Sequence, residues 1–362
     1  MGLLRPGPLT PGEGRGAGSN PPNRFERTHR EPLEIEVEYG PDEAPPVRTL
    51  FFPDTSRTLL AKNDSPDVPF TFSLNPYRGC EHGCVYCYAR PSHEYLGFSA
   101  GLDFESRIMV KLDAPELLER ELSRPRWEPQ IVALSGNTDC YQPAERSFRL
   151  TRRCLEVLHR FRNPAGIITK NSLLLRDLDL LVPMARLGIV EVMITVTTLD
   201  ADLARTLEPR ASSPAKRLEA VEQLSRAGVP VGVHLAPVIP GLTDEEIPAI
   251  LNEAARRGAG STGFVLLRLP GAVEPLFKDW VERHLPERAG KILGRIRGTR
   301  GGSMSDSRFG TRMRGTGSIA SSMHDLFTVS ARKAALRTRT EGPTVKHFRR
   351  PSGPQTELFA SD

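Results

Sequence analysis

Short apolar segments alternate with helical segments along the middle of this chain. Six runs rich in β-forming residues cover residues 70–74, 131–134, 166–170, 190–197, 229–236 and 263–269. Helical patterns lie between them over residues 144–161, 173–187, 214–227 and 244–257. Short apolar runs are typical of parallel strands that are buried on both faces. The alternation therefore predicts an α/β fold of parallel β/α units with right-handed crossovers.

Three cysteines follow the first of these segments. Cys80, Cys84 and Cys87 lie within eight residues and have the spacing C-x3-C-x2-C. Soft thiolates are suitable ligands for iron–sulfur clusters. Three thiolates on one short loop predict a [4Fe–4S] cluster in which three irons are held and the fourth is open to a substrate or cofactor. Because the loop follows a strand, we expect it at the C-terminal ends of the strands, where parallel barrels place their active sites.

A zinc site is the main alternative for these cysteines. A structural zinc ion normally takes four protein ligands, often as two separated pairs. The next cysteine, Cys140, is far along the chain, and His82 and His93 do not complete such a pattern. A disulfide framework is disfavoured by the total of 5 cysteines and by an N-terminus without an apolar signal segment. The pattern favours iron–sulfur ligation and leaves zinc as a minor alternative.

The cysteine spacing resembles that of the radical S-adenosylmethionine (SAM) superfamily, whose open iron chelates the amino and carboxylate groups of SAM. Tyr86, just before the third cysteine, is similar to an aromatic residue that packs beside the adenine of SAM in this family. Taken by itself, it is better explained as a loop aromatic that packs on the core. The resemblance implies a partial (β/α)6 barrel, a [4Fe–4S] cluster, SAM, and an electron donor such as flavodoxin or ferredoxin.

Four further segments are similar to the spore-photolyase-like branch of this superfamily; they cover residues 75–80, 138–145, 168–171 and 235–241. In that branch a lysine after the third strand contacts SAM, which implies this role for Lys170. A hydroxyl after the second strand does the same and matches Thr138 or, less closely, Ser135. An alanine before a proline lies by the adenosine and matches Ala236. The branch also has a hydrogen-donating cysteine; Cys140 lies in the corresponding loop without a clear match, and a structural role is the alternative.

Other polar residues near the strand ends have both functional and structural interpretations. Thr195 and Thr197 alternate with apolar residues and therefore share one face of their strand. We expect Thr195 at the cofactor site, although β-propensity alone explains threonines in a strand. The loop with Ser135 and Thr138 is equally consistent with ordinary turn hydrogen bonds. His234, within the fifth segment, is more often a hydrogen-bonded interior residue than a catalytic base.

Composition divides the 362-residue chain into four predicted regions. Residues 1–45 are rich in Pro, Gly, Arg and Glu without periodicity, which predicts a disordered N-terminal arm. Residues 46–68 are expected to form a short embellishment, with a strand over residues 49–52. Residues 69–275 form the predicted core domain. Residues 276–362 form a predicted basic C-terminal extension.

Positive charge is concentrated near the C-terminus, although the whole chain has a net charge of only +5. Residues 291–350 contain 14 Lys and Arg against three acidic residues. This asymmetry predicts a polyanionic partner such as nucleic acid, with a solvated, partly disordered tail as an equal alternative. No apolar run reaches transmembrane length, so we expect no membrane partner. An oxygen-sensitive cluster predicts a reducing, cytoplasmic location.

These observations predict a radical SAM enzyme that cleaves SAM to a 5′-deoxyadenosyl radical, which then abstracts a hydrogen atom from the substrate. By resemblance, the expected substrate is nucleic acid, as in lyase-type repair of a DNA photoproduct, with residues 291–350 holding phosphates. RNA, a peptide or a small metabolite is an alternative substrate. A non-catalytic iron–sulfur or zinc module that binds nucleic acid is the alternative from another class.

Overall fold

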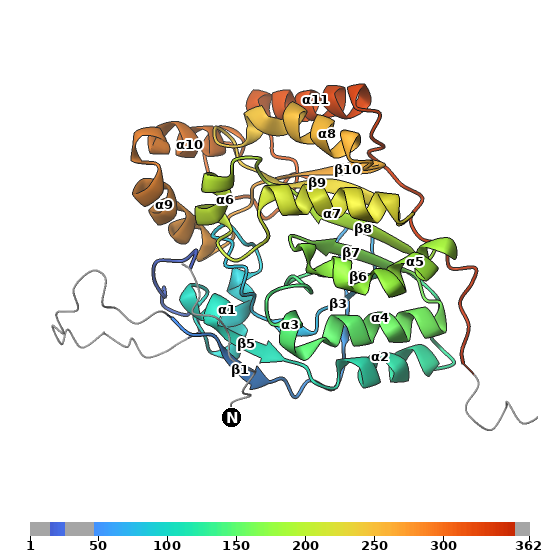
Figure 1. Ribbon diagram of the computed structural model, residues 1–362. Coiled ribbons are helices and arrows are strands. Elements are labelled where there is room, and N and C mark those ends of the chain that lie inside the picture. The colour runs from blue at the N-terminus through green and yellow to red at the C-terminus, as the bar shows by residue number, and fades with distance from the viewer. Residues whose placement is uncertain (1–14, 26–46, 352–362) are drawn as a thin grey trace, which may run out of the picture.

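A single open sheet forms the centre of the molecule. The computed structural model describes residues 15–25 and 47–351 (Figure 1). Its main sheet has seven strands in the order β10-β9-β8-β7-β6-β3-β2. Their bounds are β2 Leu60–Lys62, β3 Phe72–Leu74, β6 Val132–Leu134, β7 Ala165–Thr169, β8 Val190–Thr195, β9 Val231–Val238 and β10 Ser261–Leu266. Strand β2 is antiparallel to β3, and all other pairs are parallel. The six parallel strands confirm the six predicted segments.

The sheet does not close into a barrel, because β10 and β2 are its two edges. This open arrangement agrees with the expected partial barrel. The strands are buried because their residues are almost entirely apolar; Val192, Ile194 and Val233, for example, have no more than 1% of their surface exposed. A core on both faces explains why the strands read as continuous apolar runs instead of alternating ones.

Helices cover one face of the sheet, and Figure 1 shows α2, α4, α7 and α8 as a layer over the strands. The helices of the β/α region are α2 Ala114–Ser123, α3 Glu145–Phe148, α4 Leu150–Phe161, α5 Leu178–Arg186, α6 Ala201–Leu207, α7 Pro214–Arg226 and α8 Ile247–Arg256, with 3-10 turns η2 Ser172–Asp177 and η3 Asp244–Glu246. The helix predicted over residues 144–161 is interrupted at Arg149, whose φ of 51° is left-handed. The other predicted helices are confirmed with shifts at their ends.

A second, three-stranded sheet lies beside the first. It has the order β1-β5-β4, with β1 Leu50–Pro53, β4 Tyr77–Arg78 and β5 Arg107–Val110. The strand predicted over residues 49–52 corresponds to β1. Its small core is formed by Phe51, Tyr77, Ile108 and Val110. The chain passes from β4 through the cysteine loop into η1 (Arg90–Leu96) and α1 (Leu102–Ser106), and then into β5. Two strands of the second sheet therefore flank the cysteine loop in the sequence.

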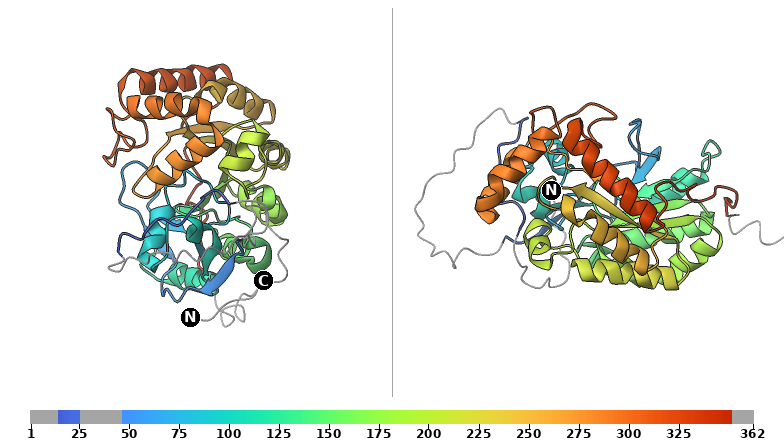
Figure 2. Two further views of the ribbon diagram at one scale, coloured as in Figure 1. Left: turned by 90° about the vertical axis from the view of Figure 1, so that its left-hand side faces the viewer. Right: turned by 90° about the horizontal axis from the view of Figure 1, so that it is seen from above.

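The C-terminal region folds onto the barrel. Helices α9 Val273–His284, α10 Pro286–Gly298 and α11 Gly317–Lys333 follow β10. Helix α11 packs on α8 through Met323 and Phe327, which belong to the main core. Figure 2 shows α11 next to α8 at the β10 edge of the sheet, with α9 and α10 to one side. The expected C-terminal extension is therefore an ordered part of the structure as far as residue 351.

The segment after α11 runs along the N-terminal ends of the strands, opposite the cysteine loop. Arg337 bridges to Ser261, the first residue of β10. The Thr344 amide donates to Gly188, just before β8, and the Arg349 amide donates to Phe161, at the end of α4. The basic residues of segment 291–350 thus lie at two different ends of the barrel. The basic residues after α11 lie along the N-terminal ends of the strands. We call residues 335–350 the C-terminal strap.

A stretch of the predicted N-terminal arm is also ordered. Residues 15–25 pack against η1 and α1, and the Asn23 side chain donates to the carbonyls of Glu94 and Phe98. The expectation of disorder is therefore wrong for residues 15–25. Buried backbone contacts, which composition does not reveal, fix them in place. Residues 1–14 and 26–45 lie outside the described part of the chain.

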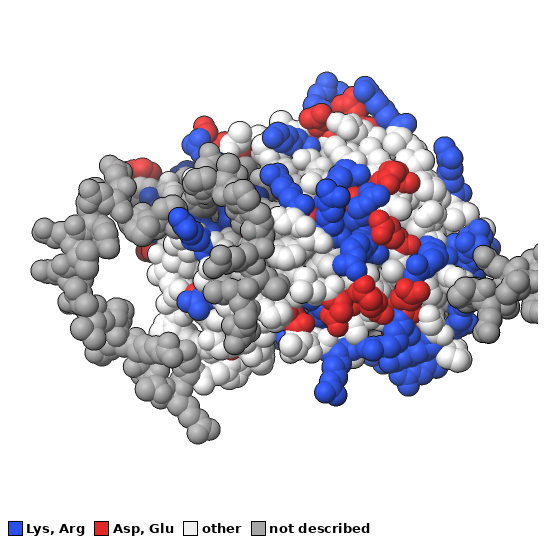
Figure 3. Space-filling model, turned by 60° about the horizontal axis from the view of Figure 1, so that its bottom comes forward, with Lys and Arg blue, Asp and Glu red and all other residues white. Residues whose placement is uncertain are grey.

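The outer helices carry both signs of charge. Ion pairs link Arg153 to Glu116 and Arg160 to Glu119, between α4 and α2. Figure 3 shows Lys and Arg next to Asp and Glu on the face that includes these helices. This face is therefore not a uniform basic surface for a polyanion. Among the residues that the structure describes, no helix is both long and apolar enough to cross a membrane.

Candidate active site

The three clustered cysteines lie on a compact loop between β4 and η1. Successive turns join the Gly83 amide to the Cys80 carbonyl at 3.3 Å and the Cys87 amide to the Cys84 carbonyl at 3.2 Å. Gly83 has a φ of 68°, which a side chain would strain. All three thiols are free, and those of Cys80 and Cys84 are buried. The turns bring the three thiols to one place without disulfide pairing.

A fully buried arginine, Arg90, holds this loop from inside. Its guanidinium donates to backbone carbonyls on both sides of the turn and to one carboxylate. These acceptors are Gly83 O (3.1 Å), Cys84 O (2.9 and 3.0 Å), Ala100 O (3.2 Å), Gly101 O (3.0 Å) and Glu105 Oε1 (2.5 Å). Nearly every donor of the guanidinium is satisfied, so the loop's backbone is fixed independently of any bound group.

The N-terminal residues 15–25 cover the outer side of the loop, and we call them the N-terminal strap. The Glu105 carboxylate accepts from the amides of Gly16 at 3.0 Å and Ala17 at 2.8 Å. A Cβ on Gly16 would lie 1.8 Å from the Gly83 carbonyl oxygen. Only glycine permits this approach, so the strap contacts the cysteine loop backbone to backbone. Glu105 thus connects the strap and Arg90 in one buried unit.

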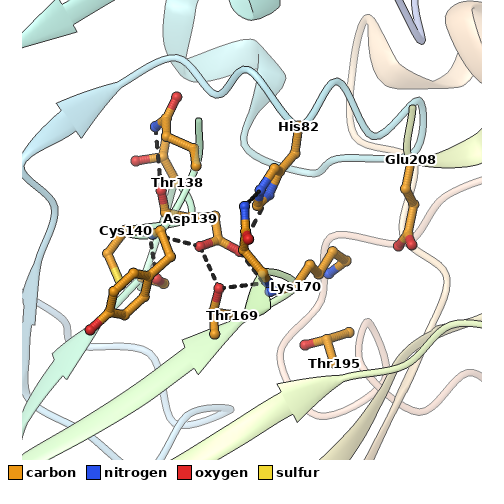
Figure 4. A network of polar contacts seen from close by, with 12 residues as sticks. His82, Thr138, Asp139, Cys140, Thr169, Lys170, Thr195 and Glu208 are labelled. Carbon is orange, nitrogen blue, oxygen red and sulfur yellow. Dashed lines mark hydrogen bonds and ion pairs between the residues drawn. The ribbon is translucent and has the colours of Figure 1, made fainter. Parts of the chain in front are cut away.

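A second network links the cysteine loop to the ends of β6 and β7 through Asp139, and Figure 4 shows it. Asp139 accepts from the Thr169 hydroxyl (2.8 Å) and the Lys170 amide (2.8 Å), and lies 3.4 Å from His82 Nδ1. Burial alone would raise the pKa of Asp139, but His82 and these hydrogen bonds lower it to about 2. The other ring nitrogen of His82 contacts Asn171 at 3.1 Å. Both nitrogens of His82 are therefore engaged, which disfavours the zinc alternative.

Tyr86 is anchored by a third network, centred on Glu208 in the loop after α6. Its hydroxyl donates to Glu208, which also accepts from the Thr197 hydroxyl at 2.8 Å and pairs with the buried Arg217. Burial would raise the pKa of Glu208, but Arg217 and then Lys170 outweigh it and lower the pKa to about 2. Glu208 is therefore a carboxylate at neutral pH, and it fixes the Tyr86 ring in one orientation.

Lys170 extends from the end of β7 toward the same region. Its ammonium lies 5.9 Å from the centre of the Tyr86 ring and donates to the Ala236 carbonyl at 3.4 Å. Three of the predicted cofactor-binding residues, Tyr86, Lys170 and Ala236, thus meet beside the cysteine loop. Thr195 lies at the end of the neighbouring strand, and Figure 4 shows it close to the Lys170 side chain.

The two predicted hydroxyls after β6 are used within the loop. Thr138 donates to the Tyr77 carbonyl at 2.7 Å and is 3% exposed. Ser135 has a φ of 76° and accepts from the Cys140 amide at 2.8 Å. These contacts match the structural alternative of turn hydrogen bonds. Cofactor contacts by Thr138 and Ser135 stay predictions.

Cys140 has no exposed surface and belongs to the main hydrophobic core. Burial raises the pKa of its thiol, and the nearby Asp139 raises it further. The Thr151 hydroxyl holds the Cys140 carbonyl at 2.6 Å, which fixes the residue under α4. The position favours the structural alternative for Cys140 over a hydrogen-donating role, because a donor needs a path to the substrate.

The chemistry of the cysteine loop fits an iron–sulfur cluster. Burial raises the pKa of all three thiols; Lys170 opposes the rise at Cys84, as Arg90 does at Cys87. Buried thiols without a metal stay protonated, whereas a metal stabilises them as thiolates. Among the described residues no group of three or more His, Cys, Asp or Glu side chains is close enough to hold a single metal ion. A four-iron cluster is wider than one ion, so its ligands stand further apart.

Comparison with known proteins agrees with this geometry. The family model of the radical SAM superfamily matches residues 74–254, which is half of the chain, and the chain belongs to this superfamily. Proteins of this superfamily use a [4Fe–4S] cluster and SAM.

Two proteins from other organisms are similar to this chain in sequence. An uncharacterized protein of Mycobacterium tuberculosis, Rv2578c, is 38% identical over 61% of this chain and 65% of its own length. The uncharacterized protein MJ0683 of Methanocaldococcus jannaschii is 30% identical over 60% of this chain and 77% of its own length. The matched region thus spans about two thirds of the mycobacterial relative.

Among solved structures, spore photoproduct lyase complexed with dinucleoside spore photoproduct has a TM-score of 0.58, with 18% identity over 80% of this chain and 81% of that chain. A Y98F mutant of the same lyase has a TM-score of 0.57, with 17% identity over the same shares of the two chains. At this identity the likeness concerns the fold.

Several residues of the site were not identified from the sequence. Arg90, Glu105 and Glu208 act through buried contacts with segments far away in the chain, and nothing in their local pattern distinguishes them from surface charges. His82 was considered only as a zinc ligand. A usable signal is present for Arg90 alone, since it lies three residues after Cys87 and charged residues are buried only when paired.

Proposed function

We propose that this protein is an enzyme that cleaves SAM reductively at a [4Fe–4S] cluster held by Cys80, Cys84 and Cys87. The observation that carries the proposal is the convergence of a fixed three-thiol loop with Tyr86, Lys170 and Ala236 at the C-terminal ends of the strands. When bound, the cluster and SAM together supply a 5′-deoxyadenosyl radical, and the hard chemistry belongs to them. The protein's own part is to position SAM and the substrate, to provide charged groups at the site and to exclude water from it.

Each side chain has a specific part in this proposal. Lys170 pairs with the SAM carboxylate as a charge-assisted hydrogen bond. Tyr86 packs against the adenine, with its ring held by Glu208. Ala236 offers backbone beside the adenosine. Thr195, from the neighbouring strand, adds a hydroxyl at the same site. Cluster reduction requires an external donor of one electron, such as a flavodoxin or ferredoxin.

We further propose that the substrate is a nucleic acid. Two observations support this choice: the basic residues between Arg300 and Arg314 lie on the loop next to β10, and the fold resembles that of spore photoproduct lyase, a protein whose structure holds a dinucleoside photoproduct. The C-terminal strap, residues 335–350, is not part of the proposed nucleic-acid surface, because it lies along the N-terminal ends of the strands, opposite the cysteine loop. A reaction on a base requires that base to be accessible outside the stack.

The substrate proposal is tested by hydrogen abstraction. The reduced, cluster-loaded protein is incubated with SAM and either UV-irradiated oligonucleotide, unirradiated oligonucleotide, RNA or a peptide pool, all in deuterated form. Deuterium in 5′-deoxyadenosine from a nucleic-acid sample, and repair of photoproduct in the irradiated one, is the expected result. Deuterium from the peptide pool alone would contradict the nucleic-acid proposal while leaving the SAM chemistry intact.

A further inference from the structure

Arg268, two residues after β10, lies beside the cysteine loop and pairs with no carboxylate in the described part of the chain. Its guanidinium stacks on the ring of Tyr88 at 5.5 Å, and Tyr88 directly follows Cys87. The Tyr88 hydroxyl donates to the Gly136 carbonyl at 2.9 Å, so the ring is held in place although 47% of the residue is exposed. Arg268 therefore lies at the open C-terminal end of the barrel, next to the proposed reaction site.

The donors of Arg268 are poorly satisfied. Within residues 15–25 and 47–351, its only hydrogen-bond contact is to the Met313 sulfur at 3.6 Å, and it forms no ion pair. Arg90 and Arg217, two fully buried arginines at this end, each pair with a carboxylate, whereas Arg268 is only partly buried. A guanidinium carries five N–H donors, and no nitrogen of Arg268 is among the fully buried, unpartnered polar atoms of the described residues. Its unpaired donors are therefore open to solvent and available to an acceptor from outside the chain.

The neighbouring charges do not supply that acceptor. Asp67 is the closest candidate, but it pairs with Arg312 and accepts from the Gly310 amide at 2.7 Å. Asp306 is occupied by Arg308 at 3.0 Å. The local carboxylates are therefore committed to other partners, and a net positive charge remains around Arg268.

A second guanidinium, that of Arg300, reinforces this charge from behind. It donates to the carbonyl of Leu267, adjacent to Arg268, at 2.5 Å and to that of Thr311 at 3.0 Å, and its buried Nε has no partner among the described residues. Burial lowers the pKa of Arg300 to about 10, with Asp306 opposing and Arg268 adding to the decrease. Burial and the nearby Arg312 also lower the pKa of Arg268. Burial is the main cause of both shifts, and the neighbouring guanidinium charges lower the two pKa values further.

We propose that Arg268, backed by Arg300, is a binding site for a phosphate-type oxyanion of the substrate. A guanidinium fork matches a phosphate with two parallel hydrogen bonds. Building on the nucleic-acid substrate proposed above, the anion is a backbone phosphate next to the reacting nucleotide. Stacking on Tyr88 holds the fork in one plane, so the site fixes the register of the strand relative to the cysteine loop.

The test compares binding of a single-stranded oligonucleotide to the full-length, cluster-loaded protein and to Arg268→Gln. Arg226→Gln is the matched control, because Arg226 is an exposed residue of the outer helix α7, lies outside residues 300–314 and pairs with Glu222 in the same helix. Anisotropy is recorded from 50 to 300 mM salt. We expect Arg268→Gln to weaken binding about tenfold and to reduce the salt slope by about 0.7, the value for one phosphate on a single strand. Arg226→Gln changes affinity less than twofold, and Arg268→Lys lies between.

A second arm separates this site from the nucleic-acid proposal. Thermal stabilisation by inorganic phosphate and by a nucleoside 5′-monophosphate is measured for the same variants, and their melting temperatures without ligand control for folding. Phosphate protection that is lost in Arg268→Gln, combined with no oligonucleotide binding by the wild type, supports the oxyanion site and contradicts the nucleic-acid substrate. Oligonucleotide binding that is equal in wild type and Arg268→Gln overturns the oxyanion site and leaves the nucleic-acid proposal standing.

Discussion

Arg90 and Glu105 form an ion pair with no exposed surface, and the distance between Nη2 and Oε1 is 2.5 Å. The pair lies between the cysteine loop, which Arg90 holds by its carbonyls, and the N-terminal strap, whose amides Glu105 binds. These two residues thus join the cysteine loop and the N-terminal strap, which are distant in sequence. The cysteine loop is preorganised by this pair, which lowers the entropy that cluster binding has to overcome.

Removing one partner of this pair is expected to be severe. Glu105→Gln leaves the Arg90 charge buried without its carboxylate, and such a loss costs about 3–5 kcal/mol. The free energy of unfolding is measured by urea denaturation of the metal-free protein. Glu116→Gln is the control, because Glu116 forms an exposed pair with Arg153 and should lose less than about 1 kcal/mol. Equal losses in the two variants would contradict the structural role of the buried pair.

The N-terminal strap, residues 15–25, is expected to slow the loss of iron from the cluster. Gly16→Ala places a Cβ 1.8 Å from the Gly83 carbonyl oxygen and forces the strap away from the loop. Overpacking of this kind costs about 1–3 kcal/mol, so iron release to a chelator should accelerate about tenfold.

The control for this experiment is Gly18→Ala in the same strap. Its new Cβ meets the flexible end of the Arg283 side chain at 2.7 Å, which can move aside. Iron release from Gly18→Ala should equal that of the wild type. A normal rate in Gly16→Ala would show that the strap does not support the loop.

How much of this arrangement the sequence predicts depends on the range of the interactions. The strands and most helices have local periodicity, and the cysteine spacing is local as well, so both were predicted. Arg90, Glu105 and Glu208 depend on partners as far as 122 residues away and have no local signature. The same reason explains why residues 15–25 were expected to be disordered. Their composition is that of a disordered arm, but specific acceptors in α1 bind them.

Glu208 provides a prediction for pH. Its pKa is lowered from 4.5 to about 2 in the folded protein, so it contributes stability that is complete above pH 4.5 and is lost as pH falls toward 2. The difference in unfolding free energy between wild type and Glu208→Gln should therefore be largest near neutral pH, at about 3–5 kcal/mol, and should shrink below pH 4.5. Urea denaturation from pH 3 to 7 measures it. A difference that is constant over this range would contradict the charged state of Glu208.

Lys170 is expected to contribute to SAM affinity through charge. Replacement by Met keeps the length of the side chain and removes the ammonium, and a charge-assisted hydrogen bond is worth about 1.5–3 kcal/mol. The Kd for SAM, measured on the anaerobic cluster-loaded protein by calorimetry, should rise about tenfold or more. Lys216→Met, on the exposed side of α7, is the control and should have no effect. Unchanged affinity in Lys170→Met would remove Lys170 from the cofactor site.

The central claim is that the three-cysteine loop supports reductive cleavage of SAM. The most direct measurement is anaerobic reconstitution with iron and sulfide, followed by dithionite, SAM and oligonucleotide, with 5′-deoxyadenosine quantified by mass spectrometry. Cys84→Ala and the buried core variant Cys154→Ala are tested in parallel. We predict deoxyadenosine from the wild type and Cys154→Ala and none from Cys84→Ala. A wild-type protein that carries four irons and sulfides, binds SAM and releases no deoxyadenosine would contradict the account.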